Sequence, residues 1–428
     1  MKLRYMIIGA GGVGGPVGAY LSKSGADTTL IARGKHLAVL QEHGLTLVSG
    51  ENERESIPVK AIDMDGFLAA REQGAPAPDV IFVCVKGYSL ADTVPFIRKA
   101  AGRDTVVIPV LNIYGTGRAL QAELPELLVT DGCIYISANR IAPGVIQKHG
   151  AICRIVYGLP SHKTDHPVLQ QVETDLKNAG IDPVYSPYVE RDTLLKFAYV
   201  SPNAACGQYY HAKAAEMQHP GEVRDSFVRL MKEVVALADK MGIPLENRPG
   251  ELVERNLRIL DALAPTASTS MQRDMEAGKQ SEVDGLIYHV VRLAEQYGVE
   301  DKIEFLGSLS GEEMKQAFLD ANVFVLPSTI ENSPNSLGEA MLLGVPCVAA
   351  DVGGVTTMMR HRLEGEVYPS TAPYMLAFYV ENIFAQGEAA EAMGAAARAH
   401  AGVTHDPEKN LADLLEIYER LAKNSAEG

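Results

Sequence analysis

The chain has 428 residues and a mass of 46.1 kDa, a length that predicts two or three domains. Its hydrophobic fraction of 46% excludes a disordered chain, and its net charge of −15 at pH 7 argues against nucleic acid or anionic membrane as a general partner. The acidic excess is uneven, because residues 301–428 hold 8 basic and 19 acidic side chains. This asymmetry indicates that two unlike parts share the chain.

We predict neither secretion, nor membrane insertion, nor metal binding for this chain. The first apolar run ends at Gly9, which makes it too short for a signal peptide, and no later run approaches the roughly 18 apolar residues of a membrane span. The five cysteines are widely spaced and lack a C-x-x-C pair, so we expect reduced core residues rather than disulfides or a zinc site. We predict a soluble cytoplasmic protein.

A glycine-rich loop follows the first predicted strand. The strand 3–8, a helix over 16–24 and a second strand over 27–32 give the order of a dinucleotide-binding βαβ unit. Glycines in such a loop permit a tight turn, a close approach of the backbone to a pyrophosphate, and packing of the helix against the strand. The candidate cofactor-binding residues of this loop are Gly9, Ala10, Gly11, Gly12, Val13 and Gly14.

The residue after the second strand discriminates between cofactors. NAD sites place Asp or Glu there to bind the ribose 2′-hydroxyl, whereas this chain has Arg33. An arginine can pair with a 2′-phosphate through two parallel hydrogen bonds. The sequence therefore favours NADPH, and the alternative is that Arg33 is an ordinary surface charge.

Polar residues follow two of the later predicted strands. The strands are expected at 80–85, 105–110 and 132–136; Lys86 follows the first of them and Asn112 the second. Carboxyl ends of parallel strands face the ligand crevice of an open α/β sheet. Both residues are candidates for contact with cofactor or substrate, and the alternative is solvation of the strand ends.

The next part of the chain is predicted to be helical. Apolar residues recur at helical spacing over 226–241, 252–263 and 285–296. A Rossmann half followed by an all-helical half places an active site in the cleft between the two domains.

Up to about residue 299 these features resemble the ketopantoate reductases, which belong to the 6-phosphogluconate-dehydrogenase-like group. The resemblance depends on the glycine loop, on Lys86 and Asn112, and on four further motifs. The first motif is Pro143-Gly144 together with His149-Gly150, and the second is Lys196, which is expected to open a helix. The third is the run from Ser270 to Asp274, and the fourth is the run from Ser281 to Asp284. The most specific feature is the twelve-residue interval from Ser270 to Glu282.

The resemblance implies a role for each matching residue. Lys196 is expected to be the general acid and Glu282 to hydrogen-bond the reacting oxygen. Asn112, Ser270, Asn203 and Asp274 are assigned to the substrate. Lys86 is expected to support NADPH, and Asn112 and Glu282 are also assigned to the cofactor.

Reduction of a 2-keto acid needs a hydride at the carbonyl carbon and a proton at its oxygen. A partly desolvated lysine has a lowered pKa and can deliver that proton. Lys196 has apolar neighbours, which is unusual for a surface lysine, and its alternative is an exposed helix lysine. The alternative for Glu282 is a carboxylate at a helix start. Two positions after the lysine that are asparagine in the family are Val200 and Ala204 here. A glycine of the family is replaced by Ile113. These departures concern the substrate pocket, so the sequence predicts the reaction more firmly than the substrate.

Residues 300–428 resemble part of another enzyme, the nucleotide-sugar half of a family 4 (group 1) retaining glycosyltransferase. The resemblance depends on the run ANVFVLPS from Ala321, on the E-x7-E pair Glu331 and Glu339, and on Gly353-Gly354. It implies that Glu339 binds a ribose, that Glu331 binds a sugar hydroxyl, and that the helix after Ser336 receives a diphosphate. The alternative is that both glutamates are helix-start charges.

Together these features predict an α/β chain with three parts. The parts are an NADP-binding Rossmann domain (1–180), a helical catalytic domain (181–299) and a partial glycosyltransferase-like α/β segment (300–428). The predicted function is NADPH-dependent reduction of a 2-keto acid such as ketopantoate, in a possible homodimer. The alternatives are a nucleotide-sugar-binding protein and an inactive fusion, natural or assembled. Because the third part lacks a complete sheet, we expect it to pack on the helical domain or to self-associate.

Overall fold

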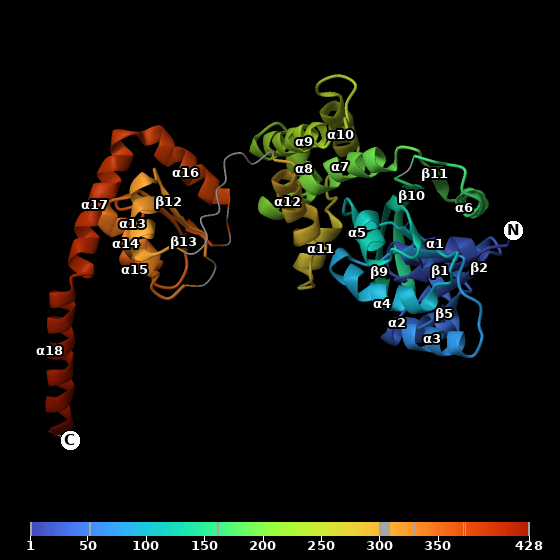
Figure 1. The fold of residues 1–428 in the computed structure, drawn as a ribbon, viewed down its shortest axis with the longest axis horizontal. Helices are drawn as coiled ribbons and strands as arrows, with labels where there is room; N and C mark the ends of the chain where they lie inside the picture. Colours follow the sequence, from blue (N-terminus) through green and yellow to red (C-terminus); the bar gives the residue numbers. More distant parts are fainter. Residues whose placement is uncertain are drawn as a thin grey trace. The chain divides into compact units, whose positions relative to one another are not determined.

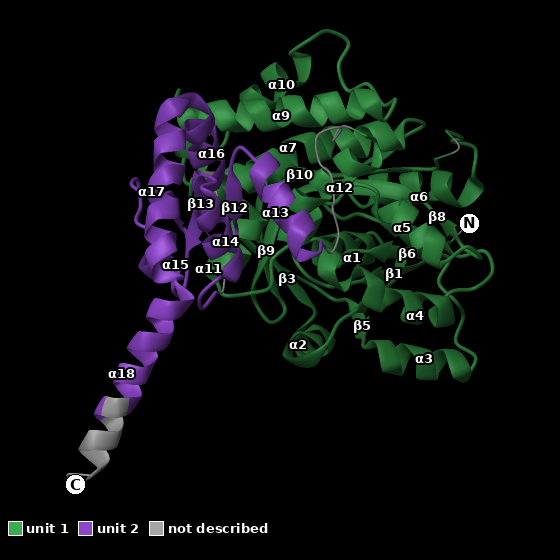
Figure 2. Cartoon of the chain, turned by 60° about the vertical axis from the view of Figure 1, so that its left-hand side comes forward, with its two compact units in different colours: residues 1–301 green, residues 302–428 purple. Residues whose placement is uncertain are grey.

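The computed structural model describes residues 2–50, 53–160, 162–298, 309–328, 331–370, 372 and 374–426. The chain forms two compact units, Met1–Asp301 and Lys302–Gly428 (Figure 2). The expected boundary between residues 299 and 300 lies outside the described residues. Within the described ranges, no helix combines the length and the apolar composition needed to cross a lipid bilayer.

The first unit begins with a six-stranded parallel sheet in the order β5-β2-β1-β6-β7-β8 (Figure 1). Its strands are β1 (Arg4–Ile8), β2 (Asp27–Ile31), β5 (Lys60–Ile62), β6 (Val80–Val83), β7 (Val106–Pro109) and β8 (Leu128–Val129). The helices between them are α1 (Gly14–Lys23), α2 (Gly34–His43), α3 (Met64–Glu72), α4 (Leu90–Ala100) and α5 (Thr116–Glu123). This strand–helix alternation confirms the predicted Rossmann domain.

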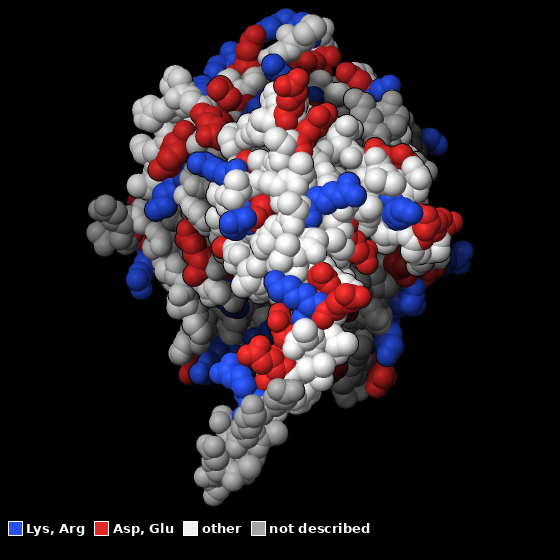
Figure 3. All heavy atoms as spheres, turned by 90° about the vertical axis from the view of Figure 1, so that its left-hand side faces the viewer, with Lys and Arg blue, Asp and Glu red and all other residues white. Residues whose placement is uncertain are grey.

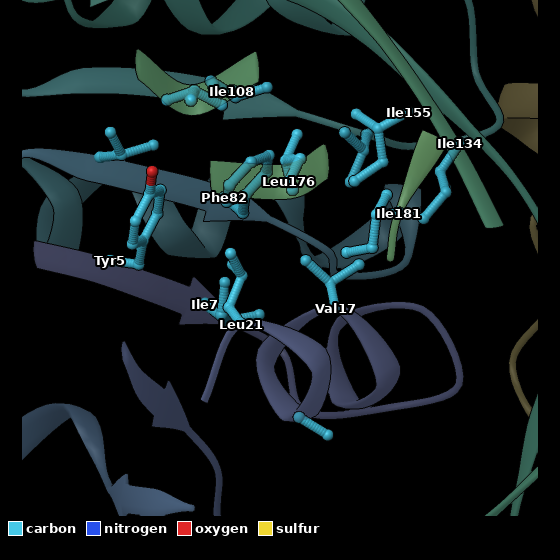
Figure 4. Packing of buried hydrophobic residues seen from close by; sticks show 14 of the residues in the cluster. Tyr5, Ile7, Val17, Leu21, Phe82, Ile108, Ile134, Ile155, Leu176 and Ile181 are labelled. Atoms are coloured by element: carbon cyan, nitrogen blue, oxygen red, sulfur yellow. The ribbon is translucent and has the colours of Figure 1, made fainter. Parts of the chain in front are cut away.

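The two faces of this sheet bury different sets of residues, because side chains alternate along each strand. Tyr5 and Ile7 of β1 belong to one hydrophobic cluster, and Met6 and Ile8 belong to another. In Figure 4, Val17 and Leu21 of α1 point toward the sheet at Ile7 and Phe82. The central strands β6 and β7 are thus buried and apolar along their whole length, as expected for a sheet that is covered on both faces.

A second sheet extends the Rossmann domain. It has the order β11-β10-β3-β4, with β9 paired to β10. Its strands are β3 (Leu45–Ser49), β4 (Glu53–Ile57), β9 (Asp131–Ala142), β10 (Val145–Gly158) and β11 (Asp182–Tyr185), and α6 (Pro167–Asn178) precedes β11. The predicted strand 132–136 is therefore only the beginning of β9, which runs antiparallel to β10 in a long hairpin.

The helical part packs around a core of its own. It comprises α7 (Val189–Tyr209), α8 (Ala214–Gln218), α9 (Glu222–Lys240), α10 (Glu251–Asp261), α11 (Ser270–Glu276), a π-helical turn η2 (Asp284–Tyr288) and α12 (His289–Gln296). The prediction that Lys196 opens a helix is wrong. The helix α7 begins at Val189, since the Ser186 hydroxyl accepts a hydrogen bond from the Tyr188 N–H and donates one to Asp192 in the first turn.

The second unit is a small α/β unit with the three-stranded parallel sheet β12-β13-β14. The strands are β12 (Phe324–Leu326), β13 (Cys347–Asp351) and β14 (Glu366–Pro369). The helices are α13 (Gly311–Asp320), α14 (Asn335–Leu343), α15 (Val355–Met358), α16 (Tyr374–Gln386), α17 (Glu388–Thr404) and α18 (Pro407–Ala426).

On the molecular face drawn in Figure 3, acidic and basic side chains are interspersed and do not form one large patch.

Candidate functional site

The glycine loop has the backbone that a dinucleotide site requires. Gly9 adopts a φ of +97°, and a Cβ there would lie 2.9 Å from the Cys84 carbonyl oxygen. A Cβ at Gly14 would lie 2.2 Å from the Gly9 oxygen, so α1 can approach the strand only because Gly14 has no side chain. A Cβ at Gly11, by contrast, meets no described atom within 4 Å. The loop therefore presents open backbone at the point where a pyrophosphate would lie.

The start of α1 completes this cradle. Val13 is the N-cap and provides no side-chain hydrogen bond to the first turn, so no side chain of the N-cap covers the positive end of the helix dipole. Such a terminus binds phosphate. The residues present thus fit a dinucleotide cofactor.

The beginning of α2 borders a hollow of about 430 Å³. Its lining consists of two short segments that are far apart in the sequence, and they contribute three cationic side chains. The lining residues are Arg33, Lys35, His36, Arg140, Ile141, Ala142 and Pro143. Arg33 borders this hollow from the start of α2, and Arg140 reaches it from the end of β9.

Lys86 connects the Rossmann domain to the helical domain. Its Nζ lies 2.8 Å from Glu282 Oε2 and 2.9 Å from Asp274 Oδ2, and the Gly87 N–H donates to Glu282 Oε1 at 2.9 Å. Burial acts to lower the pKa of Lys86, but the two carboxylates outweigh burial and raise it. Lys86 is therefore held as an ammonium group at the edge of the parallel sheet.

Lys196 has a different environment from that of Lys86. Only 7% of this residue is exposed, which excludes the alternative of an exposed helix lysine. Its Nζ donates to Asn112 Oδ1 at 2.7 Å and to the carbonyl oxygen of Ile134 on β9, and it lies 5.3 Å from the centre of the Tyr135 ring. Burial lowers the pKa of Lys196 and outweighs the nearby Glu282 carboxylate, which acts to raise it.

The structure brings the predicted site residues together in two groups. One group is Lys196 with Asn112, and the other is Lys86 with Asp274 and Glu282. Ser270 begins α11 and Asn203 is buried on α7, but neither makes a hydrogen bond to these two groups within the described part of the chain. Glu282, which the resemblance assigns to the reacting oxygen and to the cofactor, is paired with Lys86.

Ile113 occupies space between the two groups of site residues. Its Cδ1 lies 2.2 Å from the position that a Cβ would take at Gly87, and 2.2 Å from the corresponding position at Gly285 in η2. Glycine at these two positions therefore makes room for the isoleucine. The departure from the family glycine at residue 113 is compensated by small residues on both sides.

Sequence reasoning did not identify Tyr135, His36 or Arg140 as parts of this region. All three reach it through the β9–β10 hairpin or through contacts with it, and a local motif does not reveal such long-range pairing.

In the second unit, the predicted glutamates lie around the start of α14. Glu339 is exposed on α14 and Glu331 is half-buried in the preceding loop. The Gly354 N–H donates to the Asn332 oxygen at 2.7 Å, and a Cβ at Gly353 would lie 1.6 Å from the Glu331 oxygen. The Gly353-Gly354 pair thus packs directly against the loop that carries Glu331. The helix begins at Asn335 rather than after Ser336.

A doubly wound domain with an open glycine loop, followed by a helical domain that supplies a buried lysine, defines a two-domain dinucleotide-dependent oxidoreductase. The family comparison specifies this class further. Residues 5–161 match the family Ketopantoate reductase PanE/ApbA, and residues 189–303 match its C-terminal part. The chain therefore belongs, through its first unit, to the ketopantoate reductase family, whose members are oxidoreductases that bind a nicotinamide dinucleotide.

Individual relatives agree with this assignment. A 2-dehydropantoate 2-reductase of Aquifex aeolicus is 24% identical over 304 residues, covering 70% of this chain and 93% of the relative. The crystal structure of 2-dehydropantoate 2-reductase from Methylococcus capsulatus has a TM-score of 0.61 at 23% identity, covering 69% and 92%. D-Mandelate dehydrogenase, solved with NADH and anilino(oxo)acetate, shares the fold with a TM-score of 0.59 at 17% identity, covering 69% and 93%.

A later part of the chain, which overlaps the end of the previous match, matches a different family. Residues 283–400 match Glycosyl transferases group 1, which confirms the predicted resemblance. An uncharacterized glycosyltransferase of Methanocaldococcus jannaschii is 36% identical over 92 residues, covering 21% of this chain and 23% of the relative. The chain thus spans about a quarter of that relative, and it joins most of the length of a ketopantoate reductase family member to a segment similar to part of a glycosyltransferase.

Proposed function

We propose that the first unit catalyses the NADPH-dependent reduction of a 2-keto acid, ketopantoate or a related compound, with Lys196 as the general acid. The observation that carries this proposal is the environment of Lys196. A lysine ammonium has three N–H donors, and neutral acceptors at Asn112 and Ile134 take two of them. The third is left for a carbonyl oxygen of the substrate.

The protein groups have distinct roles in this reaction. When bound, the nicotinamide cofactor supplies the hydride that reaches the carbonyl carbon. The Lys196 ammonium polarises the carbonyl oxygen and gives its proton to that oxygen as negative charge develops there, which its lowered pKa favours. Asn112 fixes the direction of the ammonium. Lys86, held by Glu282 and Asp274, keeps a positive charge at the edge of the sheet, where it suits the carboxylate of a keto acid or a phosphate of the cofactor.

Support for NADPH over NADH comes from the end of β2. Arg33 stands where NAD sites have a carboxylate, and it lines a hollow to which no Asp or Glu contributes among the described residues. The fold alone does not decide this preference, because D-mandelate dehydrogenase shares it and was solved with NADH.

The proposed reaction can be tested by NADPH oxidation with ketopantoate and related 2-keto acids as substrates. Lys196→Ala should lower kcat by about two orders of magnitude or more, with little change in NADPH affinity. Lys240→Ala, which removes an exposed lysine of α9, is the matched control and should leave turnover unchanged. Near-normal turnover of the Lys196→Ala variant would refute its role as the acid.

A second candidate function belongs to the other unit, and the packing of Gly353-Gly354 against the Glu331 loop favours it. We propose that residues 302–428 retain an affinity for a nucleotide sugar. A UDP-sugar should then raise the melting temperature of this unit, and Glu339→Ala should abolish the shift. A shift that survives in Glu339→Ala would contradict the assignment of that residue.

A further inference from the structure

The β9–β10 hairpin is tied to the glycine loop by a single buried side chain. His36 of α2 is 5% exposed, and its Nε2 lies 2.7 Å from the Ala10 carbonyl oxygen. Its Nδ1 accepts a hydrogen bond from the Gly144 N–H, in the turn of the hairpin, at 2.8 Å. The imidazole is therefore neutral and carries its proton on Nε2. One ring thus holds the loop, the start of α2 and the hairpin turn in a fixed arrangement.

A second contact holds the hairpin against the same loop. A Cβ at Gly12 would lie 2.5 Å from the Ala138 carbonyl oxygen of β9, so the two backbones approach as closely as glycine allows. The two contacts together hold the hairpin beside the glycine loop and the start of α2. Arg140 is consequently brought to the same hollow as Arg33 and Lys35, although it is 107 residues away from Arg33 in the sequence.

The cations around this hollow have no counter-charge of their own. The side chains of Arg33, Lys35 and Arg140 make no ion pair and no hydrogen bond with any described residue, and the hollow has no carboxylate in its described lining. The positive charge of Arg140 helps to lower the pKa of His36, after burial, so the guanidinium lies close to the ring. Three like charges around one space repel each other, and a polyvalent anion would relieve that repulsion.

We propose that Arg140 determines cofactor specificity by binding the 2′-phosphate of NADPH together with Arg33 and Lys35. This inference rests on the proposed NADPH dependence and adds a residue from the hairpin to it. The N-terminus of α2, a ten-residue helix that begins at Gly34, adds the positive end of its dipole on the same side. A guanidinium suits a phosphate because it can donate two parallel hydrogen bonds.

The test is a binding measurement on the full-length protein, made by calorimetry or by the fluorescence of the reduced nicotinamide, since the chain contains no tryptophan. Arg140→Gln should raise the Kd for NADPH by about ten- to a hundredfold, the range for a lost hydrogen bond to a charged group, and leave the Kd for NADH unchanged. Arg154→Gln is the matched control, because Arg154 is on β10 and is paired with Asp182, outside the hollow. Its two Kd values should stay at the wild-type level.

Three results would overturn the proposal in different ways. If Arg140→Gln binds NADPH like the wild type while the wild type prefers NADPH, the proposed cofactor stands and Arg140 has no part in it. If the variant loses NADPH and NADH equally, its role is to support the hairpin and not to select the phosphate. If the wild type itself shows no preference for NADPH, the cofactor part of the proposed function fails as well. The probes 2′,5′-ADP and 5′-ADP should repeat the pattern of NADPH and NADH.

Discussion

The contact of Ile113 with two glycines can be tested by adding one methyl group at a time. In Gly87→Ala the new Cβ would overlap Ile113 Cδ1, at a separation of 2.2 Å, and Gly285→Ala would meet the same atom at the same distance. Neither glycine has a positive φ, so alanine adds no backbone strain at either position. Steric overlap is then the main cost of both substitutions.

The magnitude follows from this overlap. Overpacking typically costs about 1–3 kcal/mol, and rotation at the end of the isoleucine side chain relieves part of it, so we expect about 1–2 kcal/mol. In a unit of about 300 residues that free energy corresponds to a fall of about 2–3 °C in melting temperature. Without the overlap, Gly→Ala at a compatible position would instead stabilise by about 0.4–1 kcal/mol.

The assay is scanning calorimetry of four proteins: the wild type, Gly87→Ala, Ile113→Ala and the double variant. The transition that NADPH raises identifies the first unit, because a ligand stabilises only the part that it binds. Gly87→Ala should lower this melting temperature in the wild-type background and leave it unchanged or raise it in the Ile113→Ala background. Equal losses in both backgrounds would refute the reasoning, since the cost would then not depend on Ile113.

Three further predictions concern titration and assembly. Because burial lowers the pKa of Lys196, kcat should decline on the alkaline side at a pH below the ordinary lysine value of 10.5, and a profile that is flat up to that pH would contradict the role of Lys196. Because burial also lowers the pKa of His36, the unfolded chain binds more protons there than the native chain. The melting temperature should therefore drop as the pH falls below about 6.5, and the drop should be smaller in His36→Gln. Five apolar residues of α18 are 47–61% exposed, so we expect the chain to self-associate; the double variant Leu411→Glu, Leu415→Glu should sediment as a smaller species, and identical sedimentation would contradict this expectation.

The fold could be predicted to the extent that its signals are local. The strands β1, β2 and β6 are short apolar runs bounded by polar or glycine residues, and the structure places each within two residues of its predicted position. The hairpin could not be read in the same way. The outer half of β9 leaves the core, so that Tyr135, Ser137 and Arg140 are exposed and the apolar pattern ends long before the strand does. Its length depends on pairing with β10, which no local pattern specifies.

The same limit applies to the site. The apolar neighbours of Lys196 indicated a buried lysine, and the structure buries it. However, Asn112 is 84 residues away from its partner Lys196, and Glu282 is 196 residues away from its partner Lys86. Both contacts depend on how the Rossmann and helical domains meet. The sequence therefore identified the candidate residues but did not show which carboxylate pairs with which ammonium.

This pairing has a chemical consequence. Lys86 faces two carboxylates that raise its pKa, so it is a poor proton donor but a durable positive charge. Lys196 donates its hydrogen bonds to neutral oxygens, and its burial outweighs the attraction of Glu282, so it releases a proton more readily. If Glu282 paired with Lys196 instead, the attraction would raise the pKa of Lys196 and weaken it as an acid. Because Glu282 is paired with Lys86, it is not paired with Lys196. Lys86 thus preserves the acidity of Lys196, the lysine that we propose to be catalytic.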